Sequence, residues 1–248
     1  MLTPQVRESC LSLRVACLGI SFVAMSCDAT KLQDPESIAI ADVITLEPEK
    51  ATSIADGHSR LRVIAKLGRQ TPERTDVVFR TSAGQFVGAD GANVRSVTIK
   101  SGAREAAATY IADVRAGLVT ISGAVGTIVS TRDVTLTPAL PVEIVLVPTK
   151  TAAKASGTEA IDFRATVFAA TPQAQVSRGT RVDFIAVDSA NLIDVPEMRG
   201  AVVLEGDRVT TVTHSLTSRN TRTIRVTANV TDGAKTVSSN SVYVSFTP

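Results

Sequence analysis

The sequence has no cysteine after residue 27 and no tryptophan anywhere. The three cysteines are Cys10, Cys17 and Cys27, so a mature chain that begins near residue 27 would contain no disulfide, and its fold must be held by packing. Lysine and arginine (26) nearly balance aspartate and glutamate (24). This balance leaves no electrostatic case for nucleic-acid binding.

Histidine is also scarce, and this argues against catalysis. His58 and His214 are the only two, and no H-x-x-x-H, H-E-x-x-H or Cys/His pair is present, which speaks against a zinc site. No G-x-S-x-G nucleophile elbow accompanies either histidine, so a Ser-His-Asp triad has no sequence support. The sequence predicts a non-enzyme with no catalytic residues, cofactor or metal, although an enzyme with an unrecognised site stays open.

The N-terminus carries an export signal. Arg7 and Arg14 precede the apolar run VACLGISFVAM. This run is too short to span a bilayer, because a transmembrane helix needs about 20 residues. Basic residues followed by a short apolar run and then small residues are typical of a secretory signal peptide. Residues 1–26 are therefore predicted to be a lipoprotein signal peptide.

Cys27 is the predicted lipid attachment site. The run ends in VAMSC, which resembles the bacterial lipobox, and the resemblance implies cleavage before Cys27 and a diacylglycerol on its sulfur. Lipidation also accounts for a lone cysteine without a partner. The alternatives are an ordinary signal peptide with a cysteine nearby by chance, or a retained buried helix. Two or more acyl chains make membrane anchoring stable.

Residues 27–42 are polar and are predicted to be a tether between the lipid and the first domain. The expected location is the bacterial cell envelope, with the outer membrane favoured. Asp28 follows the cysteine and resembles the inner-membrane retention signal of enteric bacteria, so the inner membrane stays open.

An internal repeat is the most informative feature of the remaining chain. ITLEPEK (44–50) matches IVLVPTK (144–150), and Thr71-Pro72 matches Thr171-Pro172 at the same offset. Further along, Val77 and Phe79 match Val182 and Phe184, and the offset is larger by five residues. The larger offset continues in two further matches: Val97 and Ile99 with Val202 and Leu204, and Val119, Ile121 and Val125 with Ile224, Val226 and Val230. The offset then increases once more, so that Thr137-Pro138 matches Thr247-Pro248. Insertions of this kind are expected in loops.

Each repeat has roughly 100 residues, and its pattern predicts short strands, with alternating apolar and polar residues, separated by turns. In RLRVIAKL (60–67) the residues Leu61, Val63, Ala65 and Leu67 are expected to face inward. Strands are predicted in the first repeat at 43–46, 60–67, 76–80, 94–99, 105–112, 118–125 and 132–136. The fold class is therefore all-β: two tandem immunoglobulin-like Greek-key β-sandwiches after a signal peptide and a short tether. The predicted domains are residues 43–139 and 140–248.

The stretches ADGHSRLRVIAKL, TDVVFRTSAGQFVG and SGAREAAATYIADVRAGLVTISGAVG resemble the bacterial immunoglobulin-like repeats of the invasin and intimin type. The resemblance covers Val43 to Pro138 well and Glu143 to Pro248 more loosely. The chain departs from the family at GRQTPERT, where an Asn-Pro-Val segment is usual. It also departs at VDFIAVDSANLID in the second repeat, which lacks the glycine of the V-x-F-x-T-x-x-G stretch of the family. The resemblance implies a spacer or adhesive role.

Several residues are weaker candidates. Phe79, Phe163, Phe184 and Phe246 fit the inward register. Phe86 and Phe168 are the aromatics that could be exposed, although each could equally cap the end of a sandwich. If exposed, they would support the alternative function of a glycan- or polymer-binding lipoprotein. Asp90-Gly91 and Asp232-Gly233 are predicted to be turns rather than calcium loops. Carboxylates near the join of the repeats, such as Glu143 and Asp133, keep a junction calcium site open.

The segment IDVPEMRG (193–200) is a possible interaction loop, because Ile193, Val195 and Met198 are apolar residues in a predicted insertion of the second repeat. The alternative is that these side chains plug the open edge of their own sandwich. Taken together, the sequence predicts a lipid-anchored, non-catalytic spacer, adhesion or protein-interaction module. Its expected partners are the membrane, through the lipid, and a protein or surface ligand, with no nucleic acid.

Overall fold

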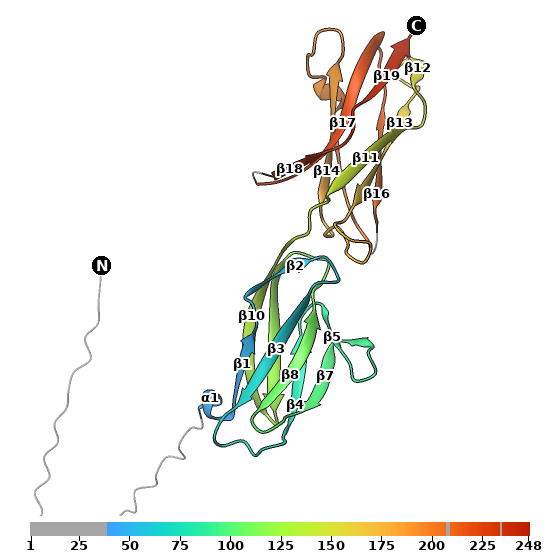
Figure 1. Ribbon diagram of the computed structural model, residues 1–248. Helices are drawn as coiled ribbons and strands as arrows, with labels where there is room; N and C mark the ends of the chain where they lie inside the picture. The colour runs from blue at the N-terminus through green and yellow to red at the C-terminus, as the bar shows by residue number, and fades with distance from the viewer. Residues whose placement is uncertain (1–38, 207–208, 234) are drawn as a thin grey trace, which may run out of the picture. The chain divides into compact units, whose positions relative to one another are not determined.

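The computed structural model describes residues 39–206, 209–233 and 235–248, and their regular secondary structure is almost entirely β-strand (Figure 1). The exceptions are a short helix, α1 (Ile40–Val43), and a 3-10 turn, η1 (Pro196–Met198). No helix within the described part of the chain is long and apolar enough to cross a membrane. Cys27, the predicted signal peptide and most of the predicted tether lie outside the described residues.

Two sheets form the first sandwich, which is built from strands β1 to β10. One sheet has the order β1-β3-β8-β5-β6 and the other the order β2-β10-β9-β4-β7. The strand bounds are β1 (Ile44–Pro48), β2 (Thr52–Ala55), β3 (Arg60–Leu67), β4 (Asp76–Thr81), β5 (Gln85–Val87), β6 (Asn93–Val94), β7 (Ser96–Lys100), β8 (Glu105–Ile111), β9 (Gly117–Val125) and β10 (Ile128–Pro138).

The second sandwich contains strands β11 to β19. Its sheets have the orders β11-β13-β16 and β12-β19-β17-β14-β15, and β18 also pairs with β17. The strand bounds are β11 (Glu143–Pro148), β12 (Ala152–Lys154), β13 (Ile161–Phe168), β14 (Arg181–Asp188), β15 (Gly200–Val203), β16 (Thr211–Leu216), β17 (Arg222–Asp232), β18 (Lys235–Ser238) and β19 (Val242–Thr247). The all-β fold class is confirmed, while the division into domains at residue 139 stays a prediction.

Alternation along the strands explains where the cores lie. In β3, Leu61, Val63, Ala65 and Leu67 are buried while Arg62 and Lys66 are exposed, as the sequence predicts. One buried cluster is confined to residues 43–136 and a second to residues 144–246. Each sandwich therefore closes its own core without a disulfide, and each fully buried aliphatic side chain contributes about 1.5–3 kcal/mol.

The four phenylalanines expected to face inward are all buried, namely Phe79, Phe163, Phe184 and Phe246. For Phe86 the sequence left two alternatives, exposure or a position capping the end of a sandwich, and exposure is wrong. Phe86 has no exposed surface, because the short strand β5 places it 6.0 Å from Phe79 and 5.8 Å from Tyr110, measured between ring centroids.

Strand registers support most of the internal repeat and correct one part of it. The pairing of β4 with β7 sets Val77 opposite Ile99, and the pairing of β14 with β15 sets Val182 opposite Val202. Ile99 therefore corresponds to Val202 and not to Leu204, a difference of two residues. The sequence alignment missed this step because a shift of two keeps the same side chains facing inward.

Candidate functional site

The two sandwiches meet through the loop 169–180, which joins β13 to β14. The corresponding loop of the first sandwich is 68–75, so the larger offset in the sequence comes from residues inserted here. Backbone groups of this loop bond to the first sandwich: the amide of Gln175 donates to the carbonyl of Asp56 (2.9 Å), and that of Arg178 donates to the carbonyl of Val114 (2.8 Å). The insertion thus forms the junction between the repeats.

Ser177 is the buried centre of this junction. Its hydroxyl donates to the carbonyl oxygen of Ala55 (2.7 Å) and accepts from the backbone amide of Ala139 (2.8 Å). The amide of Ser177 also donates to the carbonyl of Ala139 (3.0 Å). One side chain therefore satisfies buried backbone groups from the end of β2 and from the segment between β10 and β11, which would be costly to leave unpaired.

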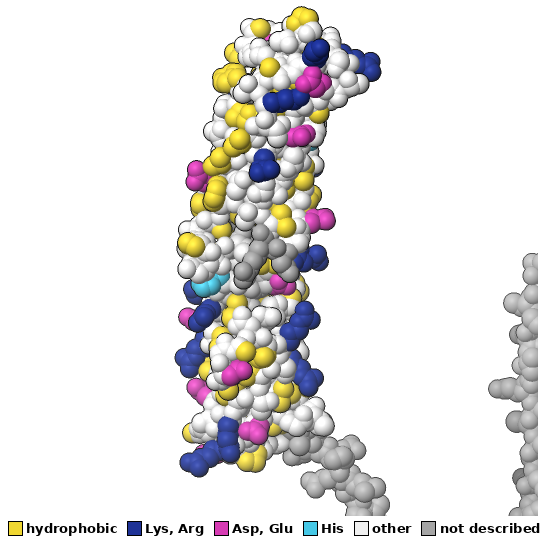
Figure 2. All heavy atoms as spheres, turned by 90° about the vertical axis from the view of Figure 1, so that its right-hand side faces the viewer, with side chains coloured by type: hydrophobic (Ala, Val, Ile, Leu, Met, Phe, Trp, Pro, Cys, Tyr) yellow, Lys and Arg dark blue, Asp and Glu magenta, His cyan; other side chains and the backbone are white. Residues whose placement is uncertain are grey.

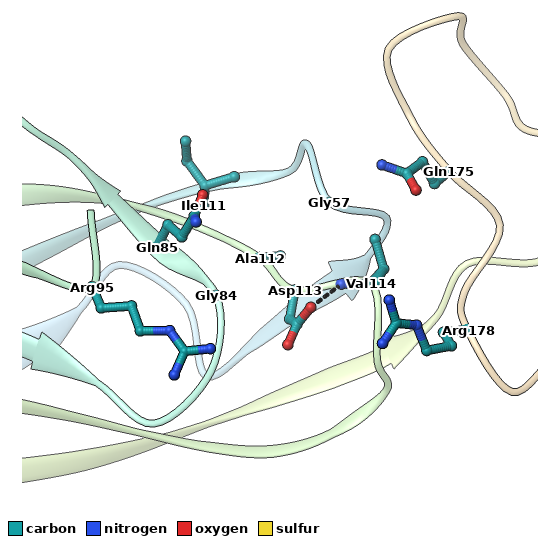
Figure 3. A pocket seen from close by; sticks show the side chains of 10 residues that line it. All are labelled: Gly57, Gly84, Gln85, Arg95, Ile111, Ala112, Asp113, Val114, Gln175 and Arg178. Carbon is teal, nitrogen blue, oxygen red and sulfur yellow. Dashed lines mark hydrogen bonds between the residues drawn. The ribbon is translucent and has the colours of Figure 1, made fainter. Parts of the chain in front are cut away.

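A cleft of about 460 Å³ lies beside this junction (Figure 3). Gly57 adopts a positive φ of 69°, and a Cβ there would lie 2.8 Å from Val114 and 3.3 Å from the Gln175 amide nitrogen. Asp113 points toward the cleft, and one of its oxygens accepts from the amide of Val114 (2.7 Å). Arg95 lines the same cleft from the first sandwich. The lining is polar and mixed in charge, and it does not form a nucleophile–base arrangement.

Tyr110 on β8 is buried in the core of the first sandwich, next to Ile111, which lines the cleft. Its hydroxyl donates to the carbonyl of Ala83 (3.1 Å). Burial, with a smaller contribution from the nearby charge of Asp113, raises the pKa of Tyr110 to about 12. A phenol with so high a pKa stays protonated and acts here as a structural hydrogen-bond donor.

The carboxylates that the sequence offered for a calcium site are spread over separate parts of the structure. Asp133 accepts from the hydroxyl of Thr120 (2.7 Å) on the exposed face of its sheet, and Glu143 begins β11 opposite Phe168. Asp90 accepts from the amide of Ala92 (3.0 Å), which closes a turn. Asp232 pairs with Lys235 across the β17–β18 hairpin, so both predicted turns are confirmed. No group of three or more His, Cys, Asp or Glu side chains arranged for a metal occurs within the described ranges.

The predicted interaction loop separates into two parts with different roles. Ile193 is 61% exposed and the neighbouring Leu192 is 71% exposed, whereas Val195 is only 3% exposed and belongs to the core. The structure gives no description of the Met198 side chain. The expectation that this loop is an insertion was wrong, because the segment 189–199 is shorter than its counterpart 82–95 in the first sandwich. The sequence posed an exposed surface and burial against the same sandwich as alternatives. Both occur, because Ile193 is exposed and Val195 is buried.

Hydrogen bonds hold the exposed part of this loop, which we call the tip loop (residues 189–194). The backbone amide of Leu192 donates to the carbonyl of Asp188 (2.9 Å), and the amide of Asp188 donates to the carbonyl of Ile193 (2.8 Å). The Asp188 carboxylate accepts from the amide of Ala190 (2.9 Å). Leu192 has a positive φ of 58°, a conformation that costs a non-glycine residue about 1–2 kcal/mol. An ordered, strained loop with two exposed apolar side chains is a candidate binding surface.

The two histidines lie in different surroundings. The His58 amide donates to the Asp56 carboxylate (2.9 Å), and its side chain is exposed next to a turn. His214 lies on β16, as expected, with its ring 5.0 Å from that of Phe184 and directly against Gly200. Its Nε2 is buried and has no hydrogen-bond partner among the described residues, and desolvation lowers the pKa of its imidazole. The packing assigns His214 a structural role.

Phe168, unlike Phe86, is exposed as predicted, with 44% of its surface accessible. It borders a groove of about 660 Å³ that is formed with the start of the loop 169–180 and with Val209. On the face in Figure 2, basic and acidic side chains are interspersed rather than gathered into fields of one sign.

The comparisons with known proteins support the fold. The chain is similar in structure to the adhesin InvE of Yersinia pseudotuberculosis, with a TM-score of 0.55, 17% sequence identity, and coverage of 84% of this chain and 59% of InvE. It is also similar to invasin, a bacterial integrin-binding protein, with a TM-score of 0.54, 19% identity, and coverage of 82% of this chain and 39% of invasin. This chain therefore spans less than two thirds of the length of either protein.

No family model matches the sequence, and no curated protein matches it significantly. The sequence identity to these structures is below 25%, so the structural similarity establishes the fold and not the activity. With alternating strands, two separate cores and these two structural neighbours, the chain has the fold of the immunoglobulin-like domains found in bacterial adhesins.

Proposed function

We propose that this chain is a lipid-anchored cell-envelope protein whose two sandwiches form a non-catalytic spacer that presents an interaction surface to another protein. The observation that carries the proposal is the arrangement of the second sandwich. The loop 169–180 bonds to the first sandwich at one end of β14, and the tip loop follows the other end of the same strand. The apolar tip is thus on the side away from the junction.

The lipid anchor rests on the sequence around Cys27. Growth with a labelled fatty acid is expected to label the wild-type protein, while Cys27→Ser should remain unlabelled and be released from membranes. Labelling of Cys27→Ser, or membrane release of the wild type, would contradict the anchor without affecting the proposal for the sandwiches.

Orientation decides between an adhesive and a scaffolding role. We expect protease treatment of intact cells to remove a C-terminal epitope while a periplasmic marker survives. Removal of the epitope would show that the sandwiches face outward and would favour an adhesive role. Survival of the epitope until the outer membrane is opened would favour a periplasmic scaffold instead.

A protein partner is supported by analogy with InvE, an adhesin, and with invasin, an integrin-binding protein. A photo-crosslinking residue in place of Ile193 is expected to yield an adduct with a protein in intact cells. Thr98 is an exposed position on β7 in the first sandwich and serves as the matched control. Adducts that form equally from both positions would contradict a specific role for the tip loop.

Binding of a glycan or another polymer is the second candidate, and the exposure of Phe168 beside its groove favours it. Stacking on an aromatic ring would require this side chain. A carbohydrate array probed with the wild type and with Phe168→Ala is the test, and Tyr243→Ala removes another exposed aromatic as a control. Binding that persists in Phe168→Ala would exclude this groove.

A further inference from the structure

The first sandwich has a parallel pair of strands that ends at the junction. Strand β2 pairs with β10 over four residues, from Thr52 opposite Thr135 to Ala55 opposite Pro138. The chain enters the sandwich before β2 and leaves it after β10. A pull on the two ends of the sandwich therefore draws β2 and β10 in opposite directions along their length. Their hydrogen bonds then carry the load together and do not break one at a time.

A side chain of the second repeat completes this strand pair. The main-chain bonds of a parallel pair are evenly spaced along it, and the amide of Thr135 donates to the carbonyl of Ala51 (2.9 Å). Four residues further along each strand, the same series reaches the amide of Ala139 and the carbonyl of Ala55. The Ser177 hydroxyl lies between these two groups, accepting from the amide (2.8 Å) and donating to the carbonyl (2.7 Å). Ser177 thus supplies the last link between the two strands.

The loop 169–180 also holds the first sandwich at two further points. The amide of Gln175 donates to the carbonyl of Asp56, just after β2, and the amide of Arg178 donates to the carbonyl of Val114. When the second sandwich is pulled away from the first, this loop pulls the end of β2 in the same direction as β10. The load is then shared between the two strands, and the shear on their hydrogen bonds is smaller.

The second sandwich has the equivalent strand pair without this added link. Strand β12 pairs with β19 in parallel over three residues, and the amide of Ala155 also donates to the carbonyl of Thr247 (2.7 Å), so the two strand pairs are similar in length. At the offset of the repeat, Ala155 corresponds to Ala55. Within the described part of the chain, no loop donates a hydrogen bond to the carbonyl of Ala155. The sandwiches therefore differ at the end of the strand pair that carries the load.

We propose that the loop 169–180 is a mechanical clamp, which lets the chain bear a pull between its membrane anchor and a partner. While the second sandwich is folded, Ser177 holds β2 and β10 together, so the second sandwich unfolds first under load. Once it has unfolded, its loop leaves the first sandwich, which then resists less. The inference rests on the proposed function, because only a chain held at both ends is loaded. It does not depend on which surface of the second sandwich holds the partner.

Optical tweezers at constant force test the proposal on the mature chain, residues 27–248. The protein is produced without its leader, so that one handle can be attached to the thiol of Cys27, the only cysteine in this range, and the other to a C-terminal tag. Strands β1 to β10 span residues 44–138 and strands β11 to β19 span residues 143–247. Unfolding of the second sandwich therefore releases about ten residues more, or about 35 Å of extended chain. The length of each step identifies the sandwich that unfolds.

We expect the longer step to come first in most wild-type molecules. Forced unfolding is governed by the unfolding rate, and loss of a buried hydrogen-bonded link should raise that rate about tenfold. In Ser177→Ala the shorter step should consequently come first about ten times more often than in the wild type. After the longer step, the remaining lifetime of the first sandwich should be equal in both proteins, because neither then has the hydroxyl in place.

Two further variants separate a clamp from a general effect on stability. Tyr110→Phe removes a hydroxyl that bonds to the carbonyl of Ala83 in the same sandwich but away from β2 and β10, so the order of the steps should stay as in the wild type. Thr137→Val removes a hydroxyl that bonds to the carbonyl of Ser53 (3.2 Å) within the loaded pair. It should make early shorter steps more frequent, and it provides a second variant if Ser177→Ala weakens folding.

Three results would overturn the proposal. The first is a shorter step that precedes the longer one in most wild-type molecules. The second is an unchanged order of steps in Ser177→Ala, which would mean that the loop comes away before either sandwich unfolds. The third is an equal change of order in Tyr110→Phe. Fatty-acid labelling and crosslinking from the tip loop are measured independently, so failure of the clamp is distinguishable from failure of the proposed function.

Discussion

The hydroxyl of Ser177 in the second repeat donates to the carbonyl oxygen of Ala55 in the first, over 2.7 Å. Ser177→Ala would leave this carbonyl and the amide of Ala139 without their partner. We expect a loss of about 2–4 kcal/mol in the free energy of unfolding, because buried backbone groups pay for desolvation when unpaired. Urea denaturation measures the loss. Ser96→Ala, at an exposed position on β7, should change stability by less than about 0.5 kcal/mol.

Gly200 and His214 form a second close contact. A Cβ at Gly200 would overlap the imidazole ring of His214, so we expect Gly200→Ala to destabilise the protein by about 1–3 kcal/mol. In a His214→Ala background the same substitution should cost much less. A double-mutant cycle by chemical denaturation measures this coupling. Equal costs in both backgrounds would show that the glycine is needed for another reason.

Stability should also depend on pH through His214. Desolvation lowers its folded pKa, so as the pH falls below about 6.5 the unfolded chain binds a proton before the folded chain does. The stabilisation is complete above that pH and is lost as the pH falls toward the folded pKa. His214→Leu should flatten this part of the stability profile. Identical slopes for the wild type and the variant between about pH 5 and 7 would refute the assignment.

Phe86 and Phe168, which the sequence analysis treated alike, should contribute very differently to stability. Phe86→Ala removes a fully buried ring from between Phe79 and Tyr110, and we expect a loss of about 3–5 kcal/mol. Phe168→Ala removes a half-exposed ring and should cost less than about 1 kcal/mol. Thermal and chemical denaturation of both variants would check the contrast, and similar losses would contradict the burial described here.

Leu192 offers a test of the strain in the tip loop. Glycine adopts a positive φ without a steric penalty, so Leu192→Gly should leave stability unchanged or raise it by about 1 kcal/mol. A clear loss of stability in chemical denaturation would show that the leucine side chain packs in the folded protein, and its role as an exposed contact would then fail.

Much of the fold was predictable because one face of each strand is buried. The strand at 60–67 was predicted at its observed bounds, since its alternation is nearly regular. Strands β2 and β5 were missed because they are short and lack such a pattern. The position of Phe86 stayed open for the same reason, because burial of that ring depends on β5 pairing with a strand distant in the sequence.

The candidate surfaces were less predictable, because they depend on long-range pairing. The offset in the repeat located the inserted residues near 173–180, but nothing local indicated that Ser177 would reach Ala55. Ile193 and Val195 are similar in polarity, and only the return of the chain onto β14 separates the exposed residue from the buried one.

The inserted loop 169–180 makes the junction directional. Only the second repeat carries the longer loop, while the carbonyl groups that receive it belong to the first. If the two repeats exchanged places along the chain, the short loop 68–75 would face the acceptor carbonyls and Ser177 would have no counterpart there. A chain in which the following repeat does not carry the longer loop would therefore not form this joint.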